Sequence, residues 1–143
     1  MGICVGIQAL FEGSAENPNV PGLGVVRGRL ERFDDSDKSV PHIGWNSAST
    51  LSTNGTSETQ SIYGMRPGSK YYYVHSFAVP YHAGELEKDG WTVATAKYGS
   101  EEFIGAIARD NILATQFHPE KSSTTGLQIL SNFVTLVREK VPA

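Results

Sequence analysis

A single cysteine, Cys4, stands between Gly2 and Gly6 at the beginning of the sequence. The spacing Gly-x-Cys-x-Gly is the thiol counterpart of the Gly-x-Ser-x-Gly nucleophile elbow, in which a strand enters a helix through a sharp, strained turn. Small residues on either side of the nucleophile let the two backbone segments approach without a Cβ clash. The pattern therefore predicts a strand, a nucleophilic cysteine and a helix, in that order.

Composition limits where such a cysteine could work. The chain has 143 residues, is 39% hydrophobic and 19% charged, and carries a formal net charge of −3, as expected for one domain with a sizeable core. It is not basic enough to suggest nucleic-acid binding, and no apolar run reaches membrane-spanning length. One cysteine cannot form an internal disulfide, and the first residues lack the features of a signal peptide. We therefore expect a cytoplasmic protein.

The hydrophobic pattern predicts a helix, a run of strands and a closing helix. The first helix is expected over residues 5–11, and residues 48–60 are expected to form an exposed loop. Strands or extended segments are expected over residues 25–33, 41–47, 70–77, 91–98, 102–108 and 112–117. The closing helix carries an apolar stripe, a candidate N-cap at Thr124 or Thr125, and Pro142 at its end. The stripe consists of Leu127, Leu130, Val134 and Val137, widened by Phe133. This order indicates an α/β sheet with antiparallel additions in one domain.

The segment Gln116-Phe117-His118-Pro119-Glu120 supplies partners for a nucleophilic thiol. It follows the last predicted strand, at a strand end where α/β enzymes place active sites. Residues two apart in an extended backbone project to the same side, and Pro119 keeps His118 out of helical geometry, so His118 and Glu120 can meet. Glu120 would then orient the imidazole toward Cys4. The helix after Cys4 would lower the thiol pKa, and the Val5 N–H would be one oxyanion donor.

Each of these residues also has a purely structural interpretation. A lone cysteine is more often a small buried hydrophobe, and a lone His-Pro-Glu is most often a loop. His82 is expected to be a surface histidine, and Trp45 and Trp91 are expected to be buried. The four histidines show no pair with ligand spacing, so no metal site is expected. No cofactor is expected either. The combination of an elbow cysteine, a helix and His-x-Glu after the last strand favours catalysis.

The chain resembles the class I glutamine amidotransferases along essentially its whole length. The segments that carry the resemblance are GICVGIQALF, PGLGVV, RFDDSDKSVPHIGWNS, YYYVHSF, AKYGSEEFIGAI and LATQFHPEKSSTTGLQILSNF. Within the family, PHIGWN is typical of the glutaminases of imidazole glycerol phosphate synthase. The sequence around RFDDSDK is most similar to the fungal form, in which a glutaminase is fused to a cyclase. The resemblance implies a flavodoxin-like sheet flanked by helices, with added antiparallel strands.

The resemblance also implies roles for particular residues. Cys4 would attack the side-chain amide of glutamine, form a glutamyl thioester and release ammonia, with His118 and Glu120 as its catalytic partners. Gln8 matches a residue that holds the substrate glutamine. A second substrate-binding segment is implied at His75, Ser76 and Phe77.

A partner is implied as well. The matching surface of the family faces a cyclase domain or subunit, through which ammonia reaches the precursor of imidazole glycerol phosphate and the purine intermediate AICAR. The residues that match this surface are Pro41, His42, Gly44, Trp45, Asn46 and Tyr72.

Family members carry a long segment before the nucleophile, including a Pro-Gly-Val-Gly loop that supplies a second oxyanion donor. From the resemblance, residues 1–143 are expected to be the C-terminal portion of an amidotransferase domain, from the nucleophile elbow onward, without the N-terminal part of the fold. Two alternatives remain open. The chain could be a non-catalytic fragment or cyclase-binding module, or it could belong to another class I glutaminase, such as one serving anthranilate or pyridoxal phosphate synthesis.

Overall fold

A computed structural model describes residues 1–50, 62–66 and 68–141. Its main sheet has five strands in the order β1-β10-β9-β8-β5. β1 pairs with β10 in parallel, and the remaining pairs are antiparallel. The strands of this sheet are β1 (Gly2–Ile3), β5 (Ser49–Thr50), β8 (Thr92–Tyr98), β9 (Glu101–Arg109) and β10 (Ile112–Thr115).

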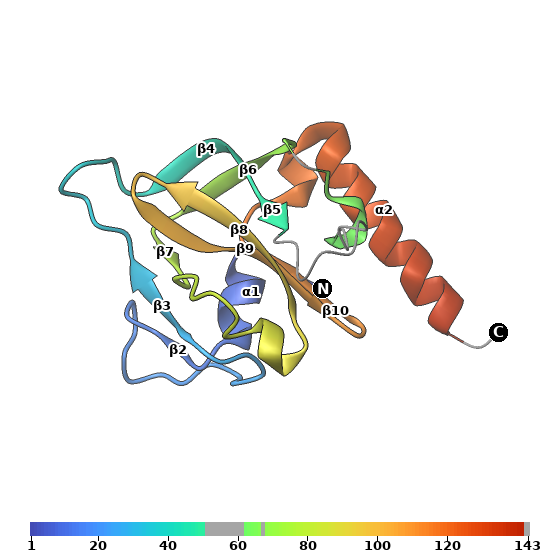
Figure 1. The fold of residues 1–143 in the computed structure, drawn as a ribbon, viewed down its shortest axis with the longest axis horizontal. Coiled ribbons are helices and arrows are strands. Elements are labelled where there is room, and N and C mark those ends of the chain that lie inside the picture. The colour runs from blue at the N-terminus through green and yellow to red at the C-terminus, as the bar shows by residue number, and fades with distance from the viewer. Residues whose placement is uncertain (51–61, 67, 142–143) are drawn as a thin grey trace.

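Two smaller sheets lie beside the main one (Figure 1). One has the order β2-β3-β7, and the other is the antiparallel pair β4-β6. Their strands are β2 (Gly13–Ser14), β3 (Arg29–Arg32), β4 (His42–Ser47), β6 (Lys70–His75) and β7 (Phe77–Ala78). The helices of the described chain are α1 (Val5–Leu10), α2 (Ser123–Lys140) and the short 3-10 turns η1 (Ile62–Gly64), η2 (Glu87–Asp89) and η3 (Pro119–Lys121).

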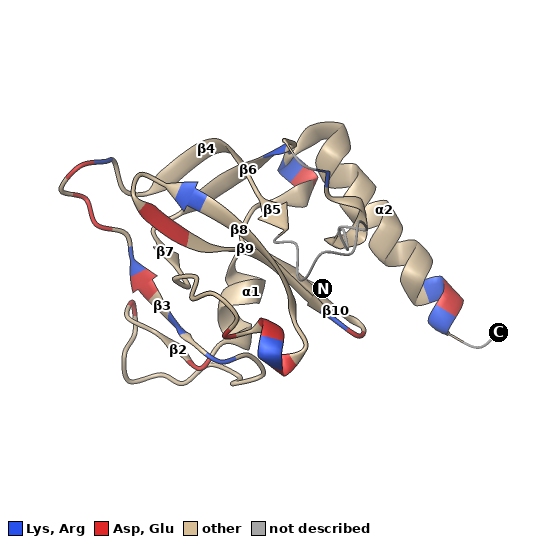
Figure 2. Cartoon of the chain, in the orientation of Figure 1, with Lys and Arg blue, Asp and Glu red and all other residues tan. Residues whose placement is uncertain are grey.

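The core forms two clusters because side chains alternate between the faces of a strand. On β9, Phe103 belongs to one cluster, and its neighbour Ile104 belongs to the other. α1 contributes Ile7 to the second cluster and α2 contributes Ile129 to the first, so a helix covers each face of the sheet. Figure 2 shows charged residues on connections, on η2, at the far end of α2 and on parts of the strands β3, β8 and β9. The mixed α/β fold with antiparallel additions is therefore confirmed.

Several expected boundaries are wrong. The strand predicted over residues 25–33 is limited to β3. The N–H of Val26 donates to the carbonyl of Leu10 at the end of α1, and the N–H of Gly28 donates to the carboxylate of Glu12, so neither residue pairs in a sheet. The loop predicted over residues 48–60 begins with the short strand β5, and residues 51–60 lie outside the described part of the chain. Trp45, which we expected to be buried, is 55% exposed.

The closing helix also differs in detail from the sequence prediction. α2 begins earlier than expected, with Ser122 rather than a threonine at the N-cap position. Its buried residues are Gly126 and Ile129, whereas Leu127, Val134 and Val137 of the expected stripe are exposed. The apolar stripe of the sequence is therefore wider than the face of α2 that the described residues bury. None of the described helices is both long and apolar enough to cross a membrane.

Candidate active site

The nucleophile elbow has the expected strand–turn–helix form. β1 pairs with β10 through Gly2–Ala114 and Ile3–Thr115, and the Cys4 N–H continues the ladder by donating to the Thr115 carbonyl at 2.8 Å. Cys4 then turns with φ 52° and ψ −100°, and α1 begins at Val5. Such a backbone conformation in a residue with a side chain costs about 1–3 kcal/mol and must be held by its surroundings.

The two glycines of the elbow have different roles. A Cβ added to Gly2 would lie 2.8 Å from the carbonyl carbon of Gly6 and 2.9 Å from its oxygen, so the strand and the first helical turn meet at this point. A Cβ added to Gly6 would meet nothing within 4 Å. Close approach therefore requires glycine at position 2, and the same steric argument does not apply to Gly6.

The thiol of Cys4 lies between two polar groups. Its sulfur is 3.9 Å from the Val74 carbonyl, to which it donates, and 3.7 Å from Nε2 of Gln116, from which it accepts. Burial raises the pKa of the Cys4 thiol, and the backbone N–H of Val5 only partly offsets this. The expectation of a lowered thiol pKa is wrong for this structure, because desolvation outweighs the start of a six-residue helix.

His118 and Glu120 meet as the His-x-Glu spacing predicts. His118 has an extended backbone, with φ −99° and ψ 99°, and its Nδ1 lies 2.6 Å from Oε1 of Glu120. A carboxylate only accepts, so Nδ1 carries the proton and Nε2 is the remaining ring nitrogen. The His118 N–H donates to the Tyr72 carbonyl at 2.9 Å, which attaches this segment to β6.

Backbone contacts bring the cysteine and the histidine to the same end of the sheet. The N–H of Cys4 donates a hydrogen bond to the carbonyl of Thr115 at the end of β10, and the carbonyl of Val74 on β6 accepts from its thiol. His118 follows β10 and is bonded to Tyr72 of the same β6 strand. In the described residues the sulfur's hydrogen-bond partners are Val74 and Gln116, and no hydrogen bond joins it directly to the His118 ring.

Gln116 is a residue of this site that sequence reasoning did not single out. It is 2% exposed, its Nε2 donates to Cys4, and its Oε1 accepts from Nε2 of Gln8 at 3.2 Å. Gln8 also donates to the Phe77 carbonyl at 3.1 Å. A polar residue at the end of the apolar run in residues 112–117 was the available signal. The expected substrate-binding residue Gln8 is thus tied to both Gln116 and the 75–77 segment.

The 75–77 segment turns from β6 into β7 beside Gln8. His75 is buried, and its Nδ1 lies 3.0 Å from the Phe77 carbonyl. Ser76 is half-buried, and its carbonyl accepts from the Phe33 N–H at 3.0 Å. Two carbonyls of this segment are therefore occupied by the protein itself.

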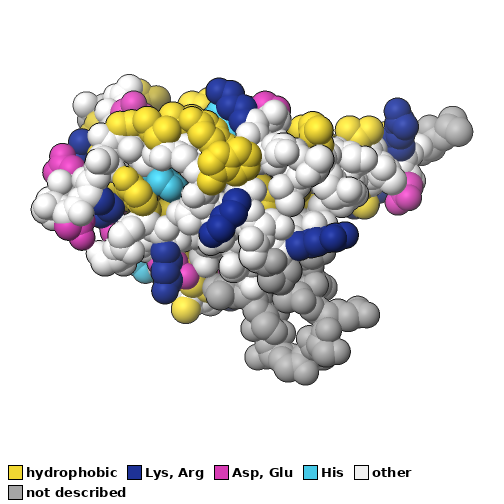
Figure 3. Space-filling view, turned by 90° about the horizontal axis from the view of Figure 1, so that it is seen from above, with side chains coloured by type: hydrophobic (Ala, Val, Ile, Leu, Met, Phe, Trp, Pro, Cys, Tyr) yellow, Lys and Arg dark blue, Asp and Glu magenta, His cyan; other side chains and the backbone are white. Residues whose placement is uncertain are grey.

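The residues expected at the partner surface point to opposite faces of β4, because side chains alternate along a strand. Trp45 and Ile43 point outward, with exposed fractions of 55% and 59%, and pair across the strands with Tyr72 and Val74. His42, which we expected at this surface, is 4% exposed and faces inward. Figure 3 views the molecule from the side on which β4 and β6 lie in Figure 1 and shows apolar side chains gathered there.

The other residues expected at this surface differ in exposure. Pro41 precedes β4 and is exposed, and Gly44 and Asn46 are half-buried. Asn46 points its amide toward His42 and the Lys97 carbonyl. Ile43, which the prediction omitted, belongs to the outward face.

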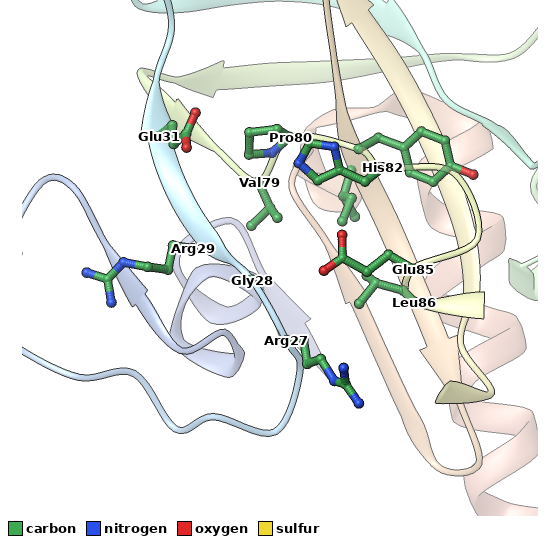
Figure 4. Close-up of a pocket in the computed structure, with 11 residues that line it drawn as sticks. Arg27, Gly28, Arg29, Glu31, Val79, Pro80, His82, Glu85 and Leu86 are labelled. Carbon is green, nitrogen blue, oxygen red and sulfur yellow. The ribbon is translucent and has the colours of Figure 1, made fainter. Parts of the chain in front are cut away.

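A cavity of about 170 Å³ lies away from these residues, between β3 and the connection that follows β7. The charged and imidazole side chains that line it belong to Arg27, Arg29, Glu31, His82 and Glu85. Figure 4 shows the Arg29 side chain extending away from His82 and Glu85. The mixed charges favour no single ligand class. No group of three or more metal-ligating side chains is found within the described residues.

Comparison with known proteins gives consistent matches. The sequence model of the family described as "Glutamine amidotransferase class-I" matches residues 1–137. Imidazole glycerol phosphate synthase hisHF of Emericella nidulans is 64% identical over 134 residues, which are 94% of this chain and 24% of that protein. The protein of the same name from Schizosaccharomyces pombe is 52% identical, again over 94% of this chain and 24% of the relative.

A shorter relative is matched over the whole chain. Imidazole glycerol phosphate synthase subunit HisH of a Synechococcus species is 44% identical over 145 residues, which cover 100% of this chain and 62% of that protein. The chain thus spans less than two thirds of these relatives. A solved structure described as "Crystal structure of glutamine amidotransferase" has a TM-score of 0.47 and 22% identity, covering 93% of this chain and 59% of that one.

Proposed function

Because this chain belongs to the class I glutamine amidotransferase family, we propose that it hydrolyses glutamine to glutamate and ammonia as the glutaminase of imidazole glycerol phosphate synthase. The names of its fungal and cyanobacterial relatives support this assignment. The observation that carries it is the 2.6 Å contact between His118 and Glu120, at the sheet end that also holds a cysteine with positive φ. We place the reaction in the cytoplasm, in histidine biosynthesis.

Cys4 is the proposed nucleophile. Its thiolate attacks the side-chain amide carbon of glutamine, and ammonia leaves as the glutamyl thioester forms. Water then attacks the thioester, releasing glutamate and regenerating the thiol. The positive φ supports this role, because a strained turn presents a nucleophile at the end of a strand. No metal or cofactor is part of the proposal.

His118 is the proposed general base and acid. Its Nδ1 is held by Glu120, so Nε2 is the nitrogen available to take the thiol proton and to deliver a proton to departing ammonia. The negative charge of Glu120 stabilises the imidazolium that forms in between. The raised pKa of the Cys4 thiol makes this base necessary, since little thiolate exists at neutral pH without it.

The amide of the substrate needs donors for its developing oxyanion. The Val5 N–H, at the first turn of α1 beside the thiol, is the proposed donor from the elbow. Gln8 and the segment of His75, Ser76 and Phe77 are the proposed substrate-binding residues, supported by the contact between Gln8 and the Phe77 carbonyl.

A cyclase is the proposed partner, and β4 and β6 are the proposed docking surface. Ile43 and Trp45 expose apolar area there, and the Val74 carbonyl on the neighbouring strand faces the Cys4 thiol. Ammonia released at Cys4 would pass through this interface to form imidazole glycerol phosphate and AICAR. The absence of a direct bond between the thiol and His118 in the described residues favours a site that a bound cyclase improves.

Ammonia release from L-glutamine tests this proposal, measured for the chain alone and with a cyclase subunit. We expect Cys4→Ala to abolish release and His118→Gln to lower it by about 10²–10⁴-fold. His82→Gln is the matched control, because His82 is exposed in the cavity away from the site. Full activity in the Cys4→Ala variant would contradict the assignment. Binding of a cyclase without ammonia release would favour a non-catalytic binding module.

A further inference from the structure

Two buried histidines, His42 and His75, face each other between β4 and the candidate site. Nδ1 of His42 lies 3.0 Å from Nε2 of His75, and the residues are 4% and 6% exposed. The proposed catalytic steps use neither imidazole. Two imidazoles in contact need a defined proton arrangement, because one nitrogen must donate and the other must accept.

The partners at the two ends of the pair determine that arrangement. Nδ1 of His75 lies 3.0 Å from the Phe77 carbonyl, which can only accept, so this nitrogen carries the proton. Nε2 of a neutral His75 must then accept, and Nδ1 of His42 must donate to it. Nε2 of His42 is left as an acceptor. Both rings are therefore Nδ1-protonated.

Asn46 satisfies the last acceptor. Its Oδ1 accepts from the Ser47 N–H at 2.8 Å, and its Nδ2 donates to the Lys97 carbonyl at 2.7 Å. These two bonds fix the amide orientation independently of the histidines. Nδ2 of Asn46 also lies 3.4 Å from Nε2 of His42, where it acts as a donor. The donor direction is therefore consistent from Asn46 to Phe77.

The surroundings favour two neutral rings. His42 stacks on Tyr98 and Tyr73, with ring centroids 4.1 and 5.0 Å away, and the edge of Phe103 completes the enclosure. Burial lowers the pKa of each imidazole to about 4. At neutral pH both rings are uncharged, as the donor sequence requires.

The Phe77 carbonyl joins this chain to the nucleophile. It accepts from His75 and also from Nε2 of Gln8, at 3.1 Å. Gln8 in turn donates to Gln116, and Gln116 donates to the sulfur of Cys4. A continuous set of hydrogen bonds therefore connects Asn46, at the edge of the proposed cyclase surface, to the thiol.

We propose that His42 and His75 are positioning residues of the glutaminase site, which hold the Phe77 carbonyl and Gln8 in register with Cys4 and link them to β4. The positioning role rests on the proposed function, whereas the proton arrangement of the two rings follows from their hydrogen bonds alone. Both rings are neutral and Nδ1-protonated, and loss of the bond between them frees the 75–77 segment. A partner that moves Asn46 would change the position of Gln8 by the same route.

The first experiment records long-range ¹⁵N–¹H correlations of the histidine rings in the full chain, with no activity involved. We expect neutral, Nδ1-protonated signals for His42 and His75 at pH 7, each assigned by its loss in His42→Phe or His75→Phe. An Nε2–H signal or a charged ring assigned to His42 or His75 at pH 7 would overturn the proton arrangement. This result stands whether or not glutamine is hydrolysed.

The second experiment compares His42→Phe and His42→Asn in glutamine hydrolysis with a cyclase present. Phe keeps the stacking on Tyr73 and Tyr98 but cannot donate to His75, whereas Asn provides an amide N–H near the position of Nδ1. We expect His42→Phe to raise KM for glutamine by about 2- to 10-fold, the range of one lost hydrogen bond, and His42→Asn to restore most of it. Equal values in both variants would overturn the positioning role. Loss of kcat alone, with KM unchanged, would also overturn it.

Discussion

Alanine in place of Gly2 is expected to destabilise the chain and displace Cys4, although the change adds one methyl group. The added Cβ would lie 2.8 and 2.9 Å from the carbonyl carbon and oxygen of Gly6, and 3.2 Å from the Ile7 nitrogen. All three are backbone atoms, so no side chain can turn aside. The first turn of α1 or the strand β1 must move instead.

The size of the effect follows from these contacts. Carbon atoms pack at about 3.5–4.0 Å, so relief of the 2.8 Å contact needs a shift of roughly 0.7 Å or more at the elbow. Overpacking of this kind costs about 1–3 kcal/mol in unfolding free energy. The same shift would move the Val5 N–H and the Cys4 sulfur, and misplacement on the order of 1 Å lowers catalytic rates by about 10²-fold.

Gly6→Ala is the matched control. Its Cβ meets nothing within 4 Å, and alanine in a helix is favoured over glycine by about 1 kcal/mol. Urea denaturation should therefore show a lower midpoint for Gly2→Ala and an unchanged or higher one for Gly6→Ala. Ammonia release should fall only in the first variant. Equal midpoints for the two variants would refute the steric account of the elbow.

Three further results are expected. Burial lowers the pKa of His42 and His75 from 6.5 to about 4, so the stability contributed by each neutral imidazole is fully present above pH 6.5 and is lost as the pH falls toward 4. The free energy of unfolding from urea denaturation should therefore be lower at pH 5 than at pH 8 by about 2 kcal/mol per imidazole. Glu120→Gln should lower kcat by up to about 10⁴-fold, because the charge that stabilises the imidazolium is lost while the fold is kept. Gly126→Ala should lower the thermal midpoint, since its Cβ would lie 1.9 Å from a carbonyl oxygen of η3, whereas Leu127→Ala, at a 56% exposed site, should not.

Local chemistry made parts of the site predictable from the sequence. The His-x-Glu contact needs only an extended backbone and a proline, and both are written in five consecutive residues. The elbow similarly follows from the spacing of Gly2 and Cys4, since Gly2 is the glycine at which β1 and α1 approach closely. The strands β8, β9 and β10 were expected within one to two residues at each end, because their apolar runs are bounded by turn residues.

Features that depend on distant partners were not predictable in this way. Gln116 lies in an apolar run, and only its contacts with Gln8 and Cys4 give it a role. His42 was assigned to a surface, but the pairing of β4 with β6 turns it inward against His75. The net pKa of the thiol depends on how deeply the assembled fold buries it, which a helix-start argument does not include.

The most direct test of the account is to trap the covalent intermediate. The chain, mixed with a cyclase subunit and L-glutamine, is quenched in acid during turnover, and its mass is measured intact and after proteolysis. The account predicts a glutamyl group bound as a thioester to the peptide that contains Cys4, and no such adduct in Cys4→Ala. Glutamine hydrolysis with no adduct on Cys4 under these conditions, or with an adduct on another residue, would contradict it.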